Sequence, residues 1–131
     1  MTKSDENALR VFERKVVRRI CGPVSEMGEW RLRNNQEIER ELEGEDIVRF
    51  IKYLRLGWVG HVERMTDSRM PKRMLYAQVF GTRRIGRPRK RWIDDVEEDL
   101  RLIHIEGWRR KARNREEWRR VCRQAKAHPG L

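Results

Sequence analysis

Residues 47–65 read IVRFIKYLRLGWVGHVERM, the longest apolar pattern in the chain. Its apolar side chains recur at helical spacing over about five turns. They are Ile47, Phe50, Ile51, Leu54, Trp58, Val62 and Met65. We therefore predict a long helix with this face buried and Trp58 at its middle. Gly57 and Gly60 each lower the stability of the helix by about 1 kcal/mol relative to alanine, so we expect another helix to cross closely at these glycines.

Signals at helix ends predict two further helices before this one. The first helix has Ser4 or Asp5 as its cap and stops at the sequence Cys21-Gly22-Pro23, since glycine and proline end helices. Residues 24–33 are predicted to be a linker. The sequence Asn34-Asn35-Gln36-Glu37 has the capping-box pattern and starts a short helix that ends near Gly44.

Helical patterns continue on the C-terminal side. Pro71 suits the first turn of a short helix that runs through Tyr76. Residues 81–88 form a loop, because glycine and proline break the period. A helix resumes from Pro88, and a last helical region over 106–127 divides at Asn114, which begins a second capping-box pattern.

These patterns together predict an all-α fold. We expect a small multi-helix bundle with a basic loop, basic C-terminal helices and little or no sheet. Its parts are an N-terminal helical portion (1–80), a basic loop (81–91), a basic C-terminal helical portion (92–127) and a tail (128–131), all within one domain. Trp108 and Trp118 fit a buried stripe, and His61 is expected to be buried and hydrogen-bonded.

The charge of the chain is strongly positive and unevenly distributed. The 131 residues include 32 Lys or Arg against 21 Asp or Glu, which gives a net charge of +11. Residues 81–131 hold 16 of these cations and 8 of the acids. Most of the cations are arginines, whose planar guanidinium group suits phosphate oxygens. Such a charge balance favours nucleic acid as the binding partner, and next an anionic membrane surface. The alternative without a binding function is a solvated, salt-bridged helical surface.

The densest basic stretch is RRIGRPRKR, residues 83–91, which has six cations and no acid. We predict that it contacts phosphates, together with exposed cations near the C-terminus. The predicted nucleic-acid-binding residues are Arg83, Arg84, Gly86, Arg87, Pro88, Arg89, Lys90, Arg91, Arg109, Arg110, Lys111, Arg119 and Arg120. The loop resembles an AT-hook, a minor-groove segment built on Arg-Gly-Arg-Pro. Ile85 replaces the first arginine of that core, which favours phosphate contact without base choice.

The acidic stretch WIDDVEED, residues 92–99, raises the alternative of a polymerase aspartate pair. A polymerase needs two metal-binding carboxylates at a strand hairpin and a third from another strand. Here Trp92, Val96 and Leu100 have helical spacing, and acids at a helix start complement the helix dipole. We therefore interpret Asp94 and Asp95 as a helix start and predict no catalytic residue.

The remaining polar residues predict no metal site and no cofactor. Cys21 and Cys122 lie far apart in the sequence without a histidine at ligand spacing, so we expect two reduced thiols. The chain has neither an apolar run of transmembrane length nor a signal-peptide pattern near its first residue. We expect an intracellular protein, nuclear or cytoplasmic, that is not secreted and has no membrane partner.

An ordered series of motifs covers residues 9–123. The motifs are FERK (12–15), RRICGP (18–23), RNNQEI (33–38), RLGWVGHVERM (55–65), RMPKR (69–73), GRPRKRW (86–92) and REEWR (115–119). In this order they resemble the C-terminal part of insect-type non-LTR (LINE-like) retrotransposon polyproteins, after the reverse transcriptase palm. Those polyproteins are endonuclease–reverse transcriptases that nick target DNA and copy their RNA from the nick.

The resemblance implies a thumb-and-tail segment without catalytic residues of its own. Its function would be to hold RNA or DNA, as template or primer–template, beside the rest of a reverse transcriptase. Two other functions stay open: a protein-interaction module whose basic face binds an acidic partner, and an AT-hook-like binder of the DNA minor groove.

Overall fold

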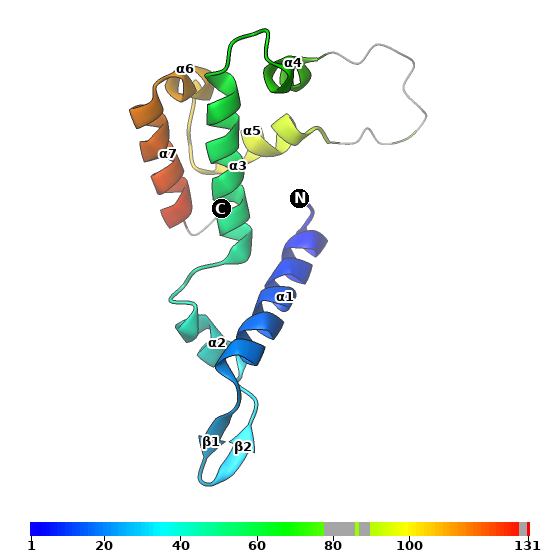
Figure 1. Ribbon diagram of the computed structural model, residues 1–131, viewed down its shortest axis with the longest axis vertical. Coiled ribbons are helices and arrows are strands. Elements are labelled where there is room, and N and C mark those ends of the chain that lie inside the picture. Colours follow the sequence, from blue (N-terminus) through cyan, green and yellow to red (C-terminus); the bar gives the residue numbers. More distant parts are fainter. Residues whose placement is uncertain (78–85, 87–89, 129–130) are drawn as a thin grey trace. The chain divides into compact units, whose positions relative to one another are not determined.

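The computed structural model describes residues 1–77, 86, 90–128 and 131 (Figure 1). Within these residues the chain forms seven helices and one two-stranded sheet, which confirms the predicted all-α class. It divides into two compact units, Met1–Ile51 and Lys52–Leu131. Helices predicted on both sides of the basic loop pack together in the second unit. No helix of the described ranges is long and apolar enough to span a bilayer.

The first helix, α1, spans Lys3–Cys21 and is capped at both ends. The hydroxyl of Thr2 accepts a hydrogen bond from the Asp5 backbone N–H, and the Asp5 carboxylate accepts one from the Thr2 N–H. The cap is thus Thr2 and not the predicted Ser4 or Asp5, because Asp5 is the reciprocal acceptor of a capping box. Gly22 ends the helix as predicted, with a φ of 69° that suits glycine.

Residues 24–33, predicted to be a linker, contain a short β-hairpin. Strand β1, Val24–Glu26, pairs antiparallel with β2, Glu29–Arg31, so that Ser25 lies opposite Trp30. Met27 and Gly28 connect the strands with φ values of 51° and 87°, as a two-residue turn with two positive φ angles requires. The prediction was wrong because each strand has only three residues, too few to show an alternating pattern.

Helix α2, Asn35–Glu41, begins at the predicted capping box. The side chain of Asn34 accepts a hydrogen bond from the Glu37 N–H, and the Glu37 carboxylate accepts one from the Asn34 N–H. Arg31 of β2 donates to the same carboxylate at 2.7 Å. Glu37 therefore connects the hairpin to the start of α2.

The Glu37 contacts predict a pH dependence of the first unit. Hydrogen bonds from Arg31, and next from the Asn34 N–H, lower the pKa of Glu37 from 4.5 to about 2. A carboxyl group with a lowered folded-state pKa stabilises the fold above its unfolded value, and this contribution is lost as the pH falls through the folded value. We expect the hairpin–α2 contact to weaken between pH 4.5 and about 2, as measured by NMR of the Glu37 carboxyl and of the Arg31 guanidinium. The Glu37→Gln variant should lack this pH step, and a Glu37 midpoint near 4.5 in the wild type would contradict the prediction.

Helix α3, Ile47–Glu63, confirms the long helix but not its predicted buried face. Val48, Leu56 and Val59 are fully buried, whereas Trp58 is 51% exposed. Phe50 and Leu54 are exposed to a similar degree. His61, predicted to be buried, is also exposed. Val62 of the predicted face is buried as predicted, but the buried side of α3 lies mainly along Leu56 and Val59.

The cause of this error is a set of polar residues on the buried face. Lys52 is buried and donates to the Leu131 carbonyl oxygen at 3.4 Å. Glu63 is buried and accepts a hydrogen bond from the Tyr76 hydroxyl at 2.5 Å. Arg55 pairs with the buried Asp99. Because these partners come from distant segments, a pattern that counts only apolar residues misplaces the face.

Four more helices follow α3, at or near the predicted positions. They are α4 (Met70–Tyr76), α5 (Trp92–Leu102), α6 (Trp108–Arg113) and α7 (Arg115–Ala127). Pro71 lies in the first turn of α4, as predicted. The predicted break at Asn114 is confirmed, since its side chain accepts hydrogen bonds from the Glu116 and Glu117 N–H groups and caps α7.

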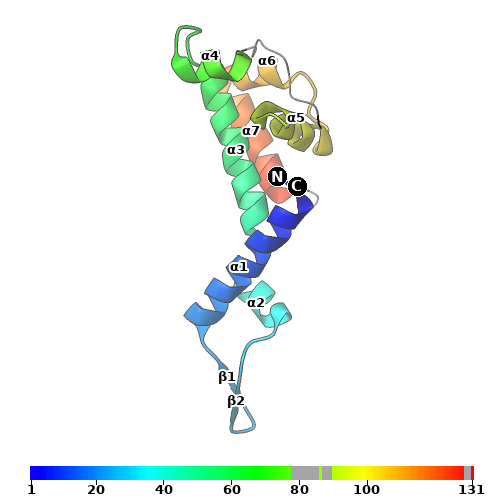
Figure 2. The same cartoon turned by 90° about the vertical axis from the view of Figure 1, so that its right-hand side faces the viewer.

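The core of the second unit lies between α3, α5, α6 and α7, with α7 alongside α3 (Figures 1 and 2). Its buried side chains are Leu56, Val59, Ile93, Val96, Leu100, Ile103, Trp108, Ala112, Trp118, Val121, Cys122, Ala125 and Leu131. Trp108 and Trp118 are therefore core residues, as predicted. Both cysteines are free thiols.

Trp118 of α7 packs closely against α3. The indole N–H of Trp118 donates to the Leu56 carbonyl oxygen at 2.9 Å. A Cβ atom on Gly60 would lie 2.0 Å from Trp118 Nε1, whereas one on Gly57 would have open space around it. The predicted close crossing is thus confirmed at Gly60 and wrong at Gly57.

Candidate nucleic-acid interface

The predicted basic loop falls largely outside the described residues. Arg83, Arg84, Arg87, Pro88 and Arg89 are not described, so their assignment to nucleic acid stays a prediction. Gly86 is exposed and has a φ of 136°, a conformation that side-chain-bearing residues rarely adopt.

The two described cations at the end of the loop already have acidic partners. Lys90 pairs with Glu98 and, at 3.5 Å, with Asp95. The hydrogen bond to Glu98 raises the pKa of Lys90, so the ammonium stays charged. Arg91 pairs with Asp94 at 3.0 Å. A phosphate at these cations would have to replace carboxylates of α5.

The contacts of Asp94 and Asp95 show the structural role of these two residues. The Asp94 carboxylate accepts a hydrogen bond from the Arg91 backbone N–H at 2.8 Å, next to the first turn of α5. Asp95 pairs with Arg55 of α3 at 3.5 Å. The interpretation of these two residues as a helix start is therefore confirmed. Within the described residues, no group of three or more His, Cys, Asp or Glu could hold a metal ion.

The predicted cations of α6 have different environments. Arg109 pairs with Glu97 at 2.9 Å and lies over the Trp108 ring, 4.5 Å from the ring centroid. This side chain covers a core tryptophan. Arg110 is exposed and Lys111 is half-buried. Of these three, Arg110 is the cation most accessible to a ligand.

Helix α7 has a row of arginines on one face. Arg115, Arg119 and Arg123 recur every four residues, which places them about 6 Å apart along the helix axis. All three are exposed, while Trp118 and Cys122 on the neighbouring face are buried. The predicted residue Arg120 is exposed beside this row.

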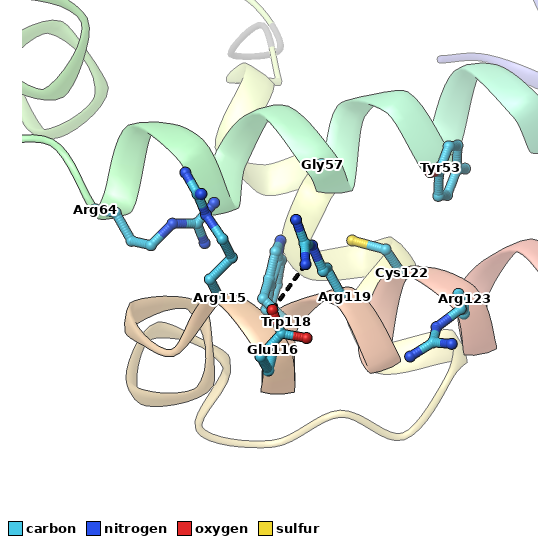
Figure 3. Close-up of a pocket in the computed structure, with 9 residues that line it drawn as sticks. All are labelled: Tyr53, Gly57, Arg64, Arg115, Glu116, Trp118, Arg119, Cys122 and Arg123. Atoms are coloured by element: carbon cyan, nitrogen blue, oxygen red, sulfur yellow. Dashed lines mark hydrogen bonds and ion pairs between the residues drawn. The ribbon is translucent and has the colours of Figure 1, made fainter.

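This arginine row borders an open groove of about 780 Å³ between α3 and α7 (Figure 3). The residues that line it are Tyr53, Gly57, Arg64, Arg115, Glu116, Trp118, Arg119, Cys122 and Arg123. Figure 3 shows Arg115 and Arg119 rising from α7 toward α3, close to Arg64. We call this concavity the arginine groove, with Arg64, Arg115, Arg119 and Arg123 as its cations.

The arginine groove has more positive charge than nearby acids can balance. Glu116 is the only acid among the described residues that line it, and it pairs with Arg119 at 2.7 Å. Arg64 donates to the Ala112 carbonyl oxygen at 2.7 Å, a neutral acceptor. Burial lowers the pKa of Arg64, and the charges of Arg115 and Arg119 act in the same direction. An anion between these guanidinium groups would relieve that repulsion.

The Cys122 thiol in the groove is uncharged at neutral pH. Burial raises the pKa of the Cys122 thiol to about 11. Cys122 therefore contributes a small apolar surface, and anion binding is the chemistry that the groove supports.

Sequence reasoning identified one of the four groove cations. Arg119 was predicted, whereas Arg64, Arg115 and Arg123 were missed. The four-residue spacing in α7 is a signal that could have shown Arg115 and Arg123. Arg64 has no such signal, because it joins the row only through the packing of α3 against α7.

The fold and the groove thus define a small, basic, mostly helical protein with an arginine-lined surface. The chain is similar to a transposon-derived protein of Caenorhabditis elegans, with 32% identity over 104 residues. That match covers 68% of this chain and 37% of the relative, so the chain spans little more than a third of the relative's length. The similarity supports a transposon-related origin. No protein-family model and no solved structure matches the chain.

Proposed function

We propose that this chain is a non-catalytic nucleic-acid-binding segment from the C-terminal region of a non-LTR retrotransposon reverse transcriptase. It contacts RNA or DNA phosphates with little sequence preference. The observation that supports this proposal is the arginine groove, whose described lining residues include four arginines and a single carboxylate, that of Glu116. Arginine pairs with phosphate oxygens through two parallel hydrogen bonds, so such a cluster suits a polyanionic backbone.

Sequence tolerance follows from the kind of contact. Phosphate contacts position a nucleic acid but carry no sequence information directly. The cations of α7 lie in a row, which can follow a backbone, and no acid lies between Arg119 and Arg123 in the sequence. The groove is therefore suited to bind the backbone of any sequence.

The biological setting of the proposal comes from two sources. The transposon-derived relative supports the origin, and the ordered motifs resemble the region after a reverse transcriptase palm. In such a protein the segment would hold template RNA or primer–template near the polymerase. The segment would supply binding and not catalysis.

The proposal predicts how salt affects binding. Replacing Arg115, Arg119 and Arg123 together by alanine should lower the slope of log affinity against log salt by about 2 to 3 units, because each neutralised phosphate contributes about 0.7 to 0.9. Fluorescence anisotropy with labelled RNA and DNA over a series of salt concentrations measures this slope.

A matched variant distinguishes the effect of the groove arginines from the effect of a lower total charge. Lys3, Lys15 and Arg19 are exposed cations of α1, and their triple alanine variant removes the same total charge. We expect it to change the slope far less than the groove variant does. Equal changes in the two variants would contradict a site in the groove, and displacement by an acidic polypeptide but not by unlabelled nucleic acid would favour the protein-interaction alternative.

A further inference from the structure

Helix α3 exposes an aromatic surface close to the arginine groove. Leu54, Trp58 and His61 are separated by four and three residues and are all exposed, so they share one face of the helix. The Trp58 and His61 rings are in contact, with their centroids 5.5 Å apart and a tilt of 47°. An indole that is 51% exposed in the middle of a helix is available to a ligand.

The position of this pair relative to the groove follows from helix geometry. Gly57 lines the arginine groove, and His61 lies one turn further along the same side of α3. His61 also lines a second hollow of about 380 Å³, together with Met65, Thr66, Arg69 and Pro71. Trp58 thus directly follows a groove residue in the chain, and His61 lines the second hollow.

Arginines beside exposed aromatic rings match the requirements of a single strand. Proteins that bind single strands combine a cationic groove, which follows the phosphates, with aromatic side chains on which bases stack. The bases of a duplex are already stacked on one another, and their faces are not accessible to a protein side chain. The aromatic pair is thus useful for a single strand and not for a duplex.

We infer that the chain binds single-stranded nucleic acid, with the phosphates along Arg115, Arg119 and Arg123 and a base stacked on Trp58 beside His61. This inference rests on the proposed function and adds the class of ligand and the residue that selects it. Because every base has a π-face, stacking agrees with binding that tolerates any sequence.

The test compares single strands with duplexes of the same sequence. In the full chain, Trp58→Ala should weaken the binding of labelled single-stranded RNA and DNA by roughly tenfold, within the range measured for stacked bases. Duplex affinity and the salt slope should stay unchanged, and Trp58→Phe should keep most of the single-strand affinity. Circular dichroism checks that the variants remain folded, as expected for a half-exposed side chain.

Trp30 provides the matched control. It is 73% exposed on β2 in the first unit, and Trp30→Ala should leave single-strand binding unchanged. If the groove variant loses binding but Trp58→Ala does not, the stacking inference is overturned while the proposed function stands. Equal wild-type affinity for single strands and duplexes would also overturn it. If neither nucleic acid shows salt-dependent binding, the proposed function itself fails.

Discussion

Gly60→Ala is expected to destabilise the second unit by about 3 kcal/mol or more, a large part of the stability of a small domain. The added Cβ would lie 2.0 Å from Nε1 and 2.2 Å from Cδ1 of Trp118. Both atoms belong to a rigid ring that is 2% exposed. The ring cannot move without losing its hydrogen bond to the Leu56 carbonyl oxygen, so α3 and α7 must separate.

Gly57→Ala is the matched control, one turn earlier on the same helix. A Cβ at Gly57 meets nothing within 4 Å. Because alanine is the better helix former, this variant should gain up to about 1 kcal/mol. Urea denaturation followed by circular dichroism measures both variants. The decisive result is that the free energy of unfolding falls in Gly60→Ala and rises in Gly57→Ala. A Gly60→Ala protein as stable as the wild type would show that Trp118 does not pack on α3 in this way.

The second large effect is expected at a buried charge pair between α3 and α5. Asp99 is 4% exposed and accepts a hydrogen bond from Arg55. Removal of one partner of a buried pair leaves the other charge without compensation, which typically costs about 3–5 kcal/mol. Asp99→Leu should therefore destabilise the second unit by an amount near the lower end of this range, since Arg55 keeps Asp95 at 3.5 Å.

A double variant tests whether charge is the cause. Arg55→Met with Asp99→Leu replaces both charges by apolar groups of similar volume, an exchange that is often neutral or stabilising. The Arg55 Nε atom is buried without a hydrogen-bond partner in the described part of the chain, which further favours recovery in the double variant. Thermal denaturation of the single and double variants gives the coupling. A double variant as unstable as Asp99→Leu alone would show that packing and not charge explains the loss.

The ends of the helices could be predicted from the sequence because they depend on neighbours in the chain. Asn34 and Asn114 cap helices through backbone groups two or three residues away, and Gly22 ends α1 through its own backbone angle. The cap of α1 is Thr2 instead of the predicted Ser4 or Asp5, because Asp5 is the reciprocal acceptor at the third helical position. Such short-range interactions are present in the local sequence, so the all-α class could be predicted.

The core and the groove depend instead on residues far apart in the chain. Apolar residues surround much of α3. The side that becomes buried is the one where Lys52 contacts Leu131, Arg55 contacts Asp99 of α5, and Glu63 contacts Tyr76 of α4. For this reason the prediction of a buried Trp58 was wrong, and its exposed ring became a candidate binding surface.

The candidate site also combines features that the sequence alone shows with features that depend on folding. The net charge of +11 and the arginines of α7 are properties of the sequence alone, and they already indicate a polyanionic ligand. The ion pair between Arg109 and Glu97, and the arrival of Arg64 beside Arg115 and Arg119, depend on tertiary packing, whereas Arg91 pairs with Asp94 only three residues away. Whether a cation is available to a ligand is decided by the acids next to it, and for Lys90, Arg91 and Arg109 those acids are carboxylates that the folding of α5 places beside them.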